Sequence, residues 1–94
     1  MNSAKRYIKN NNIVFREEDD GAFLFDPDTG NLKYLNKSAK ETFLMIDGQN
    51  DSSQITNRLL KLYPDEDSEQ VRNDVESFLQ ELLSNNFVFH TGGN

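Results

Sequence analysis

The chain has 94 residues, of which 35% are hydrophobic, so it fits one small domain with a single modest core. It contains no cysteine, which excludes a disulfide framework and a thiolate metal site. The net charge is −6, yet residues 1–16 hold four bases and no acid, which leaves 6 bases against 16 acids in the rest of the chain. An acidic body repels phosphate backbones, so we expect no nucleic acid partner.

Residues 1–12 are polar and basic, and they end in three consecutive asparagines. We expect them to form a disordered basic tail in front of a folded domain that covers residues 13–90. The tail contains no hydrophobic block, so the sequence predicts neither a signal peptide nor a membrane span. We therefore expect a cytoplasmic protein without a membrane partner.

Three short apolar runs predict a three-stranded antiparallel sheet in meander order. An acidic turn ending in Asp-Gly separates the first two runs. Before the third run, Pro27 fixes its own φ and Gly30 accepts a positive φ, which favours a tight turn. A helix start follows the third run directly, and no later segment is a strong candidate to pair with it, so we expect this run at a sheet edge. The three runs are Ile13–Arg16, Ala22–Phe25 and Asn31–Leu35.

Three helices are predicted after the sheet, each opened by a capping residue. The first begins at Asn36 or, through a competing capping box, at Ser38 with Glu41 three residues later. An Asp-Gly pair ends this helix, and a Tyr-Pro pair ends the second. Capping boxes also open the other two helices, with Asp51 and Gln54 in the second and Asp67 and Gln70 in the third.

The third helix runs to about Ser84, and its apolar residues span an arc of about 140°. One interpretation is that so small a domain needs all of these residues for its core. The other is that one margin of the arc lines a groove beside the edge strand. We place Val75 and Leu79 on that margin, with Arg72 and Glu76 bordering it.

The order of these motifs resembles the PqqD-like family over about residues 13–89. The motifs are LFDPDTG, then YLN before a helix, then IDG, a helix that ends in Tyr-Pro, and DVxxFLxxL followed by Phe-Val. One departure is the Asn-Asn pair before Phe87, where the family more often has glycine, although asparagine also tolerates a left-handed C-cap. The resemblance implies an α+β fold of the winged-helix-turn-helix type, with three antiparallel strands followed by three helices.

The resemblance also implies a function. Members of the family capture the leader segment of a ribosomally made precursor peptide and present it to a modifying enzyme. The leader adds as a strand to the third strand of the sheet and packs against the third helix.

The residues themselves support strand addition, because it needs an unpaired edge for backbone hydrogen bonds and a neighbouring groove for side chains. Lys33 lies in the middle of this run, and a lysine at that position of an edge strand also discourages pairing with strands of unrelated chains. The predicted peptide-binding residues are Asn31, Leu32, Lys33, Tyr34, Leu35, Arg72, Val75, Glu76 and Leu79.

We expect no enzyme, no cofactor and no metal site. The single histidine, His90, has no partner at metal-ligand spacing, and no phosphate-binding loop or nucleophile motif is present. The Asp-rich turn before Asn31 lacks the bidentate Glu of a calcium loop.

Several alternatives remain open from the sequence. The modifying enzyme is a radical SAM enzyme, a lasso-peptide leader peptidase with its cyclase, or another class. A winged helix that binds DNA through the third helix is a rival function, although the exposed acids of that helix have the wrong sign. The other rival is a structural protein that buries its groove in a partner. A monomer and a weak or domain-swapped dimer both fit the short linkers and exposed edges.

Overall fold

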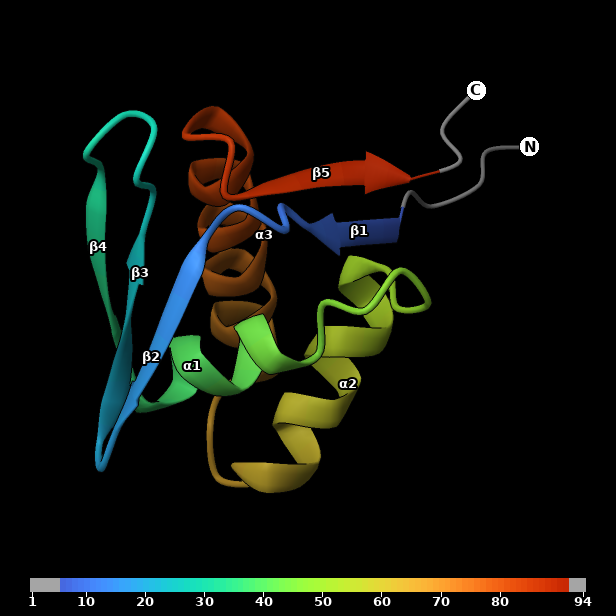
Figure 1. Ribbon diagram of the computed structural model, residues 1–94. Coiled ribbons are helices and arrows are strands. Elements are labelled where there is room, and N and C mark those ends of the chain that lie inside the picture. Colours follow the sequence, from blue (N-terminus) through green and yellow to red (C-terminus); the bar gives the residue numbers. More distant parts are fainter. Residues whose placement is uncertain (1–5, 92–94) are drawn as a thin grey trace.

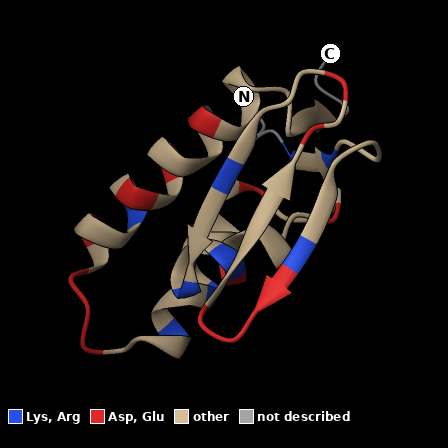
Figure 2. Ribbon diagram, turned by 60° about the vertical axis from the view of Figure 1, so that its left-hand side comes forward, with Lys and Arg blue, Asp and Glu red and all other residues tan. Residues whose placement is uncertain are grey.

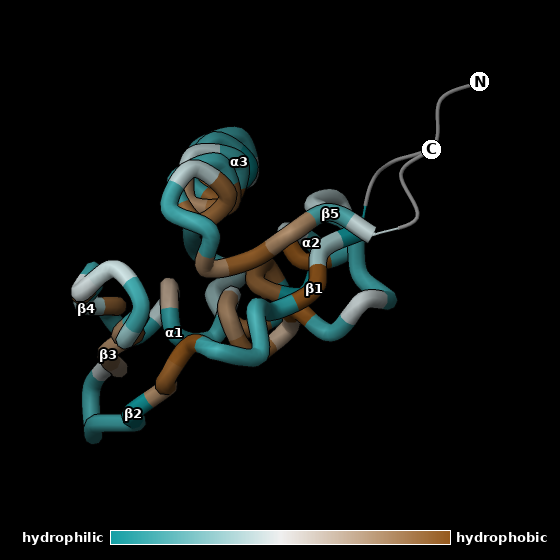
Figure 3. The backbone as a smooth tube through the Cα atoms, turned by 45° about the horizontal axis from the view of Figure 1, so that its top comes forward, coloured by the Kyte–Doolittle hydropathy of each residue, from teal (hydrophilic) through white to brown (hydrophobic). Residues whose placement is uncertain are grey.

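The computed structural model describes residues 6–91 (Figure 1). A three-stranded antiparallel sheet of order β2-β3-β4 lies on one side of α3, and a two-stranded sheet of β1 and β5 lies on the other (Figures 1 and 3). The α+β class and the meander order of the three strands are confirmed. In chain order, the elements are β1 (Arg6–Lys9), β2 (Val14–Glu18), β3 (Gly21–Phe25), β4 (Leu32–Asn36), α1 (Lys37–Leu44), α2 (Ser52–Leu62), α3 (Ser68–Ser84) and β5 (Val88–Thr91).

The turn between β3 and β4 forms as predicted, around Asp26. Its carbonyl accepts a hydrogen bond of 2.7 Å from the N–H of Gly30, and its own N–H donates to the carbonyl of Asn31 at 2.9 Å. Its buried carboxylate accepts from the N–H of Asp28 at 2.9 Å. Gly30 has a φ of 81°, a conformation that glycine adopts without strain. These bonds fix the register of the β3–β4 hairpin.

The N-cap residues of α1 and α2 are ones that the sequence predicts. Asn36 caps α1, because its side-chain oxygen accepts from the N–H of Ala39 at 2.9 Å, whereas Ser38 already lies inside the helix. The box of Asp51 and Gln54 at the start of α2 is complete, with hydrogen bonds of 2.9 and 2.8 Å. Of the two starts predicted for α1, the structure therefore selects Asn36.

The cap of α3 differs from its prediction. Asp67 occupies the N-cap position but makes no side-chain hydrogen bond there, and Gln70 donates instead to Asp74 at 2.9 Å. The predicted capping box is therefore wrong, because Gln70 has a partner one turn further along the helix. At the other end, Asn86 has a φ of 61°, so asparagine supplies the left-handed residue that follows the helix.

The core lies between the inner face of the three-stranded sheet and the helices. Side chains from every helix and from β3, β4 and β5 meet there, which fits the alternation of strands and the apolar stripes of the helices. The side chains buried most fully are Leu24, Leu35, Ile46, Ile55, Leu79, Leu82, Phe87 and Val88.

The N-terminal segment corrects the sequence prediction. We expected residues 1–12 to be disordered, yet residues 6–9 form β1, which pairs with β5 from Arg6 opposite Thr91 to Lys9 opposite Val88. The carbonyl of Tyr7 also accepts from the N–H of Gly48 at 2.7 Å, and its side chain is buried. The polar composition of this segment gave no sign that Tyr7 is buried or that β5, at the other end of the sequence, pairs with it. Residues 1–5 lie outside the described residues.

Replacing Tyr7 by alanine is expected to lower the free energy of unfolding by about 3 kcal/mol, because the change empties a buried aromatic site. Urea denaturation followed by circular dichroism measures the effect. Ile8→Ala is the matched control, since Ile8 is the next residue of β1 and its side chain is 44% exposed, and it should cost less than about 1 kcal/mol. Equal losses in the two variants would show that β1 is not docked through Tyr7.

Candidate functional site

One edge of β4 carries free backbone groups. β4 is the last strand of its sheet, and no strand among residues 6–91 pairs with its outer side. The hydrogen bond from Asp26 to Asn31 marks a bonded pair, and such pairs alternate along an antiparallel ladder, so Lys33 is bonded to β3. The N–H and C=O groups of Leu32 and Tyr34 therefore point away from β3, toward the open edge.

The side chains of β4 alternate between two surroundings. Leu32 and Tyr34 lie on the outer face of the sheet, where they are 64% and 54% exposed. Lys33 and Leu35 lie on the inner face, toward the helices, and Leu35 is fully buried in the core. The edge strand thus presents apolar side chains on one face and a lysine beside α3 on the other.

Lys33 joins the edge strand to α3. Its Nζ atom lies 2.7 Å from Oε2 of Glu81 and 6.0 Å from the centre of the Phe78 ring. The Lys33 side chain is only 20% exposed, whereas that of Glu81 is 54% exposed. The stem of the lysine therefore covers apolar surface while its ammonium group reaches a carboxylate that remains open to solvent.

Two hollows lie beside this ion pair. A polar depression of about 330 Å³ lies between β4 and the C-terminal half of α3, lined by Leu32, Lys33, Tyr34, Glu81 and Asn85 among others. A larger cavity of about 580 Å³ opens beyond the C-terminal end of β4. Apolar side chains from all three helices line much of that cavity, namely Ala39, Leu59, Val71, Val75 and Phe78. Together the hollows follow α3 along the side that faces β4.

The structure does not bring every predicted residue of α3 to this groove. Val75 and Leu79 are buried in the core, although Val75 also lines the larger cavity. Glu76 accepts a hydrogen bond of 2.8 Å from the Ser52 hydroxyl of α2, and Arg72 lies one turn before it on the same flank. Arg72 and Glu76 therefore lie away from β4, because the flank of α3 that borders the groove is the opposite one.

Phe78, Glu81 and Asn85 occupy the flank of α3 that sequence reasoning missed. They recur at intervals of three and four residues, so they share one side of the helix. The apolar arc alone does not tell which of its two margins faces the sheet edge. Charge does not decide between the margins either, because Glu76 lies on one and Glu81 on the other, so only the contact of Glu81 with Lys33 in the structure identifies this flank.

Tyr63 and Glu41 form a polar contact between α1 and the end of α2. The Tyr63 hydroxyl donates to Oε1 of Glu41 at 2.5 Å, and Tyr63 also lines the larger cavity. This hydrogen bond raises the pKa of the Tyr63 phenol above its usual value of 10, because it stabilises the protonated form next to a negative charge. The hydrogen bond thus fixes the Tyr63 side chain against α1 at the edge of the cavity.

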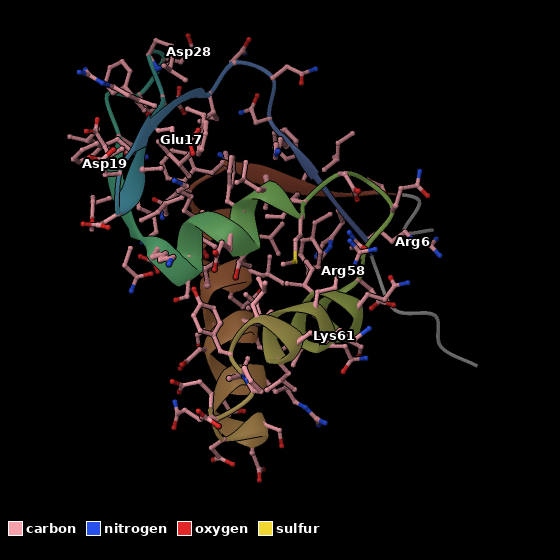
Figure 4. The ribbon with its side chains drawn as sticks, turned by 90° about the horizontal axis from the view of Figure 1, so that it is seen from below. Arg6, Glu17, Asp19, Asp28, Arg58 and Lys61 are labelled. Atoms are coloured by element: carbon pink, nitrogen blue, oxygen red, sulfur yellow. The ribbon has the colours of Figure 1, made fainter. Side chains whose placement is uncertain are left out.

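Charged side chains are distributed unevenly over the molecule. Acidic residues recur along α3 and gather at the turn between β2 and β3 (Figure 2). Figure 4 shows Glu17 and Asp19 near this turn, while Arg6, Arg58 and Lys61 lie on the other side, on β1 and α2. The acidic exposed surface of α3 opposes contact with a phosphate backbone.

Within residues 6–91, no group of three or more histidine, cysteine, aspartate or glutamate side chains is arranged to hold a metal ion. Over the same part of the chain, each helix is too short or too polar to cross a membrane.

The family model of coenzyme PQQ synthesis protein D (PqqD) matches residues 21–88. The chain belongs to the PqqD family. The part matched by the PqqD model contains β3, β4 and all three helices, so it includes both walls of the groove. Strands β1 and β2 precede that part, and β5 extends beyond it.

A solved structure has the same fold as this PqqD-family chain. It is that of TbiB1 in complex with the TbiA(beta) leader peptide, with a TM-score of 0.75 and 19% sequence identity. The alignment covers 90% of this chain and 95% of the TbiB1 chain. Among curated proteins, the comparison gives no significant match.

Replacing Glu41 by glutamine should lower the pKa of Tyr63 toward 10, because the variant removes the carboxylate that accepts the phenol proton's hydrogen bond. An NMR titration of ring-labelled tyrosine measures the change. Tyr7 is an internal control, because its pKa is raised by burial first and then by Glu76 and Asp51, not by Glu41. An unchanged Tyr63 titration in Glu41→Gln would show that the two side chains are not bonded in solution.

Proposed function

We propose that this protein binds the leader segment of a ribosomally made precursor peptide as an additional strand on β4. The observation that carries the proposal is the open edge at Leu32 and Tyr34, whose backbone groups point away from β3 beside a hollowed face of α3. Membership of the PqqD family supports it, as does the shared fold with TbiB1, which was solved with a leader peptide.

An added strand has two kinds of side chain in this geometry. Positions that exchange hydrogen bonds with Leu32 and Tyr34 place their side chains on the outer face of the sheet, beside those residues. Positions opposite Lys33 and Leu35 place theirs on the inner side, toward α3. The polar depression lies near the first of these inner positions and the larger cavity near the second.

The expected affinity follows from these contacts. About four backbone hydrogen bonds contribute roughly 1 kcal/mol each, and one or two buried apolar side chains add about 2 kcal/mol each. The cost of association and of ordering the leader offsets several kcal/mol. These gains total about 6 to 8 kcal/mol before that cost, so these contacts alone correspond to a dissociation constant of roughly micromolar or weaker.

The second half of the proposed function is presentation of the bound leader to a modifying enzyme. A leader on β4 occupies one edge of the three-stranded sheet and leaves β2 and the outer face uncovered for such a partner. Resemblance to the PqqD-like family favours a radical SAM enzyme in this role.

The test replaces Tyr34 by proline, which removes one outward N–H without taking a hydrogen bond from the β3–β4 ladder. We expect affinity for the leader of a precursor peptide encoded beside the gene to fall about ten-fold, as measured by fluorescence polarisation. Lys33→Pro, by contrast, removes an N–H that bonds to β3, so it should also lower stability.

Glu17→Pro is the matched control, because the same alternation directs the Glu17 N–H to the free side of β2, at the other edge of the sheet. Its affinity for the leader should equal that of the wild type. Normal binding by a folded Tyr34→Pro variant, or equal loss in both variants, would contradict strand addition to β4.

A further inference from the structure

The ion pair between Lys33 and Glu81 lies where an added strand would pass. Lys33 is an inner-face residue of the edge strand, and Glu81 belongs to the opposite wall of the groove. The position of a bound peptide opposite Lys33 therefore points its side chain toward this pair. Since directly opposite side chains on one face of a sheet approach within about 5 Å, the pair is within reach of that side chain.

We propose that the Lys33–Glu81 pair makes the groove selective for a peptide with Lys or Arg opposite Lys33, two residues from a large apolar side chain opposite Leu35. This inference rests on the proposed function, since it assumes a strand added to β4.

The spacing follows from the strand period. Side chains two residues apart point to the same face, so the positions opposite Lys33 and Leu35 both point toward α3. Beyond the Leu35 end of the strand lies the larger cavity, whose walls include Ala39, Val71 and Phe78. Its volume of about 580 Å³ has room for a leucine, methionine or aromatic side chain.

The sign of the charge follows from the exposure of the two partners. The Lys33 side chain is only 20% exposed and its ammonium is already bonded, whereas the Glu81 side chain is 54% exposed and its Oε1 accepts no side-chain hydrogen bond from the described residues. Asp74 lies on the same flank of α3, two turns before Glu81, and lines the larger cavity. A cation on the peptide gains the free oxygen of Glu81, and the more distant Asp74 adds to the negative potential along this flank, whereas an anion is opposed by both.

The experiment selects binders from a phage-displayed library of random 15-residue peptides on the wild type, Glu81→Lys and Glu76→Lys. Wild-type binders should be enriched in Lys or Arg two residues from a large apolar residue, and Glu81→Lys should shift this preference to Asp or Glu. Glu76→Lys makes the same change in net charge on the other flank of α3, so it should keep the wild-type preference. Glu81→Gln should lose the preference without reversing it.

One selected peptide then gives the size of the effect. Changing its cation to glutamate should weaken binding to the wild type about ten-fold and strengthen binding to Glu81→Lys. Circular dichroism checks that each variant is folded.

The outcomes separate the two proposals. If neither the wild type nor the Glu81 variants enrich any peptide, strand addition fails and the charge preference falls with it. Enriched peptides that carry the apolar residue without a cation, or with a cation preference that Glu81→Lys leaves unchanged, overturn only the charge preference. A reversal caused equally by Glu76→Lys would attribute the preference to net charge and not to the pair.

Discussion

The register between β3 and β4 determines which side chains of the edge strand meet α3. The turn at Asp26 sets that register, and a slip by one residue would exchange the faces of all five residues of β4. Leu35 would then leave the core, and Lys33 would lose Glu81. The turn therefore decides the composition of the groove as well as the pairing of the sheet.

One side of α3 packs in the core, and another side lines the groove. Val75, Leu79 and Leu82 are buried beneath the strands and the other helices, which leaves the flank of Phe78 and Glu81 to face β4. Because the core holds the helix in place, the distance from the edge strand to this flank is set before any ligand arrives. Under the proposed function, a ligand strand would meet a preformed groove, which would lower the ordering cost of binding.

Local chemistry made most of the fold predictable, and long-range packing accounts for what was missed. Turn and capping residues act within a few residues, so the meander follows from sequence and the first helix start is confined to Asn36 or Ser38, of which the structure has Asn36. The pairing of β1 with β5 joins distant segments, and no local pattern signals it. The edge strand of the candidate site was predictable because the turn before it and the helix start after it are both local signals. The flank of α3 was not, because an apolar arc has two margins and the sequence does not say that Glu76 turns toward Ser52.

The pairing of β1 with β5 also has a consequence for synthesis on the ribosome. Arg6 pairs with Thr91, so the first described strand to be made gains its partner strand only after the last one has been made. Until residues 88–91 have left the exit tunnel, the small sheet has only one strand, and the contacts of β1 with residues 48–51 are the ones available to it. Pairing across so long a separation closes late, because the loop entropy is lost before the contact is gained. The groove, by contrast, is built from β4 and α3, both complete before β5 is made.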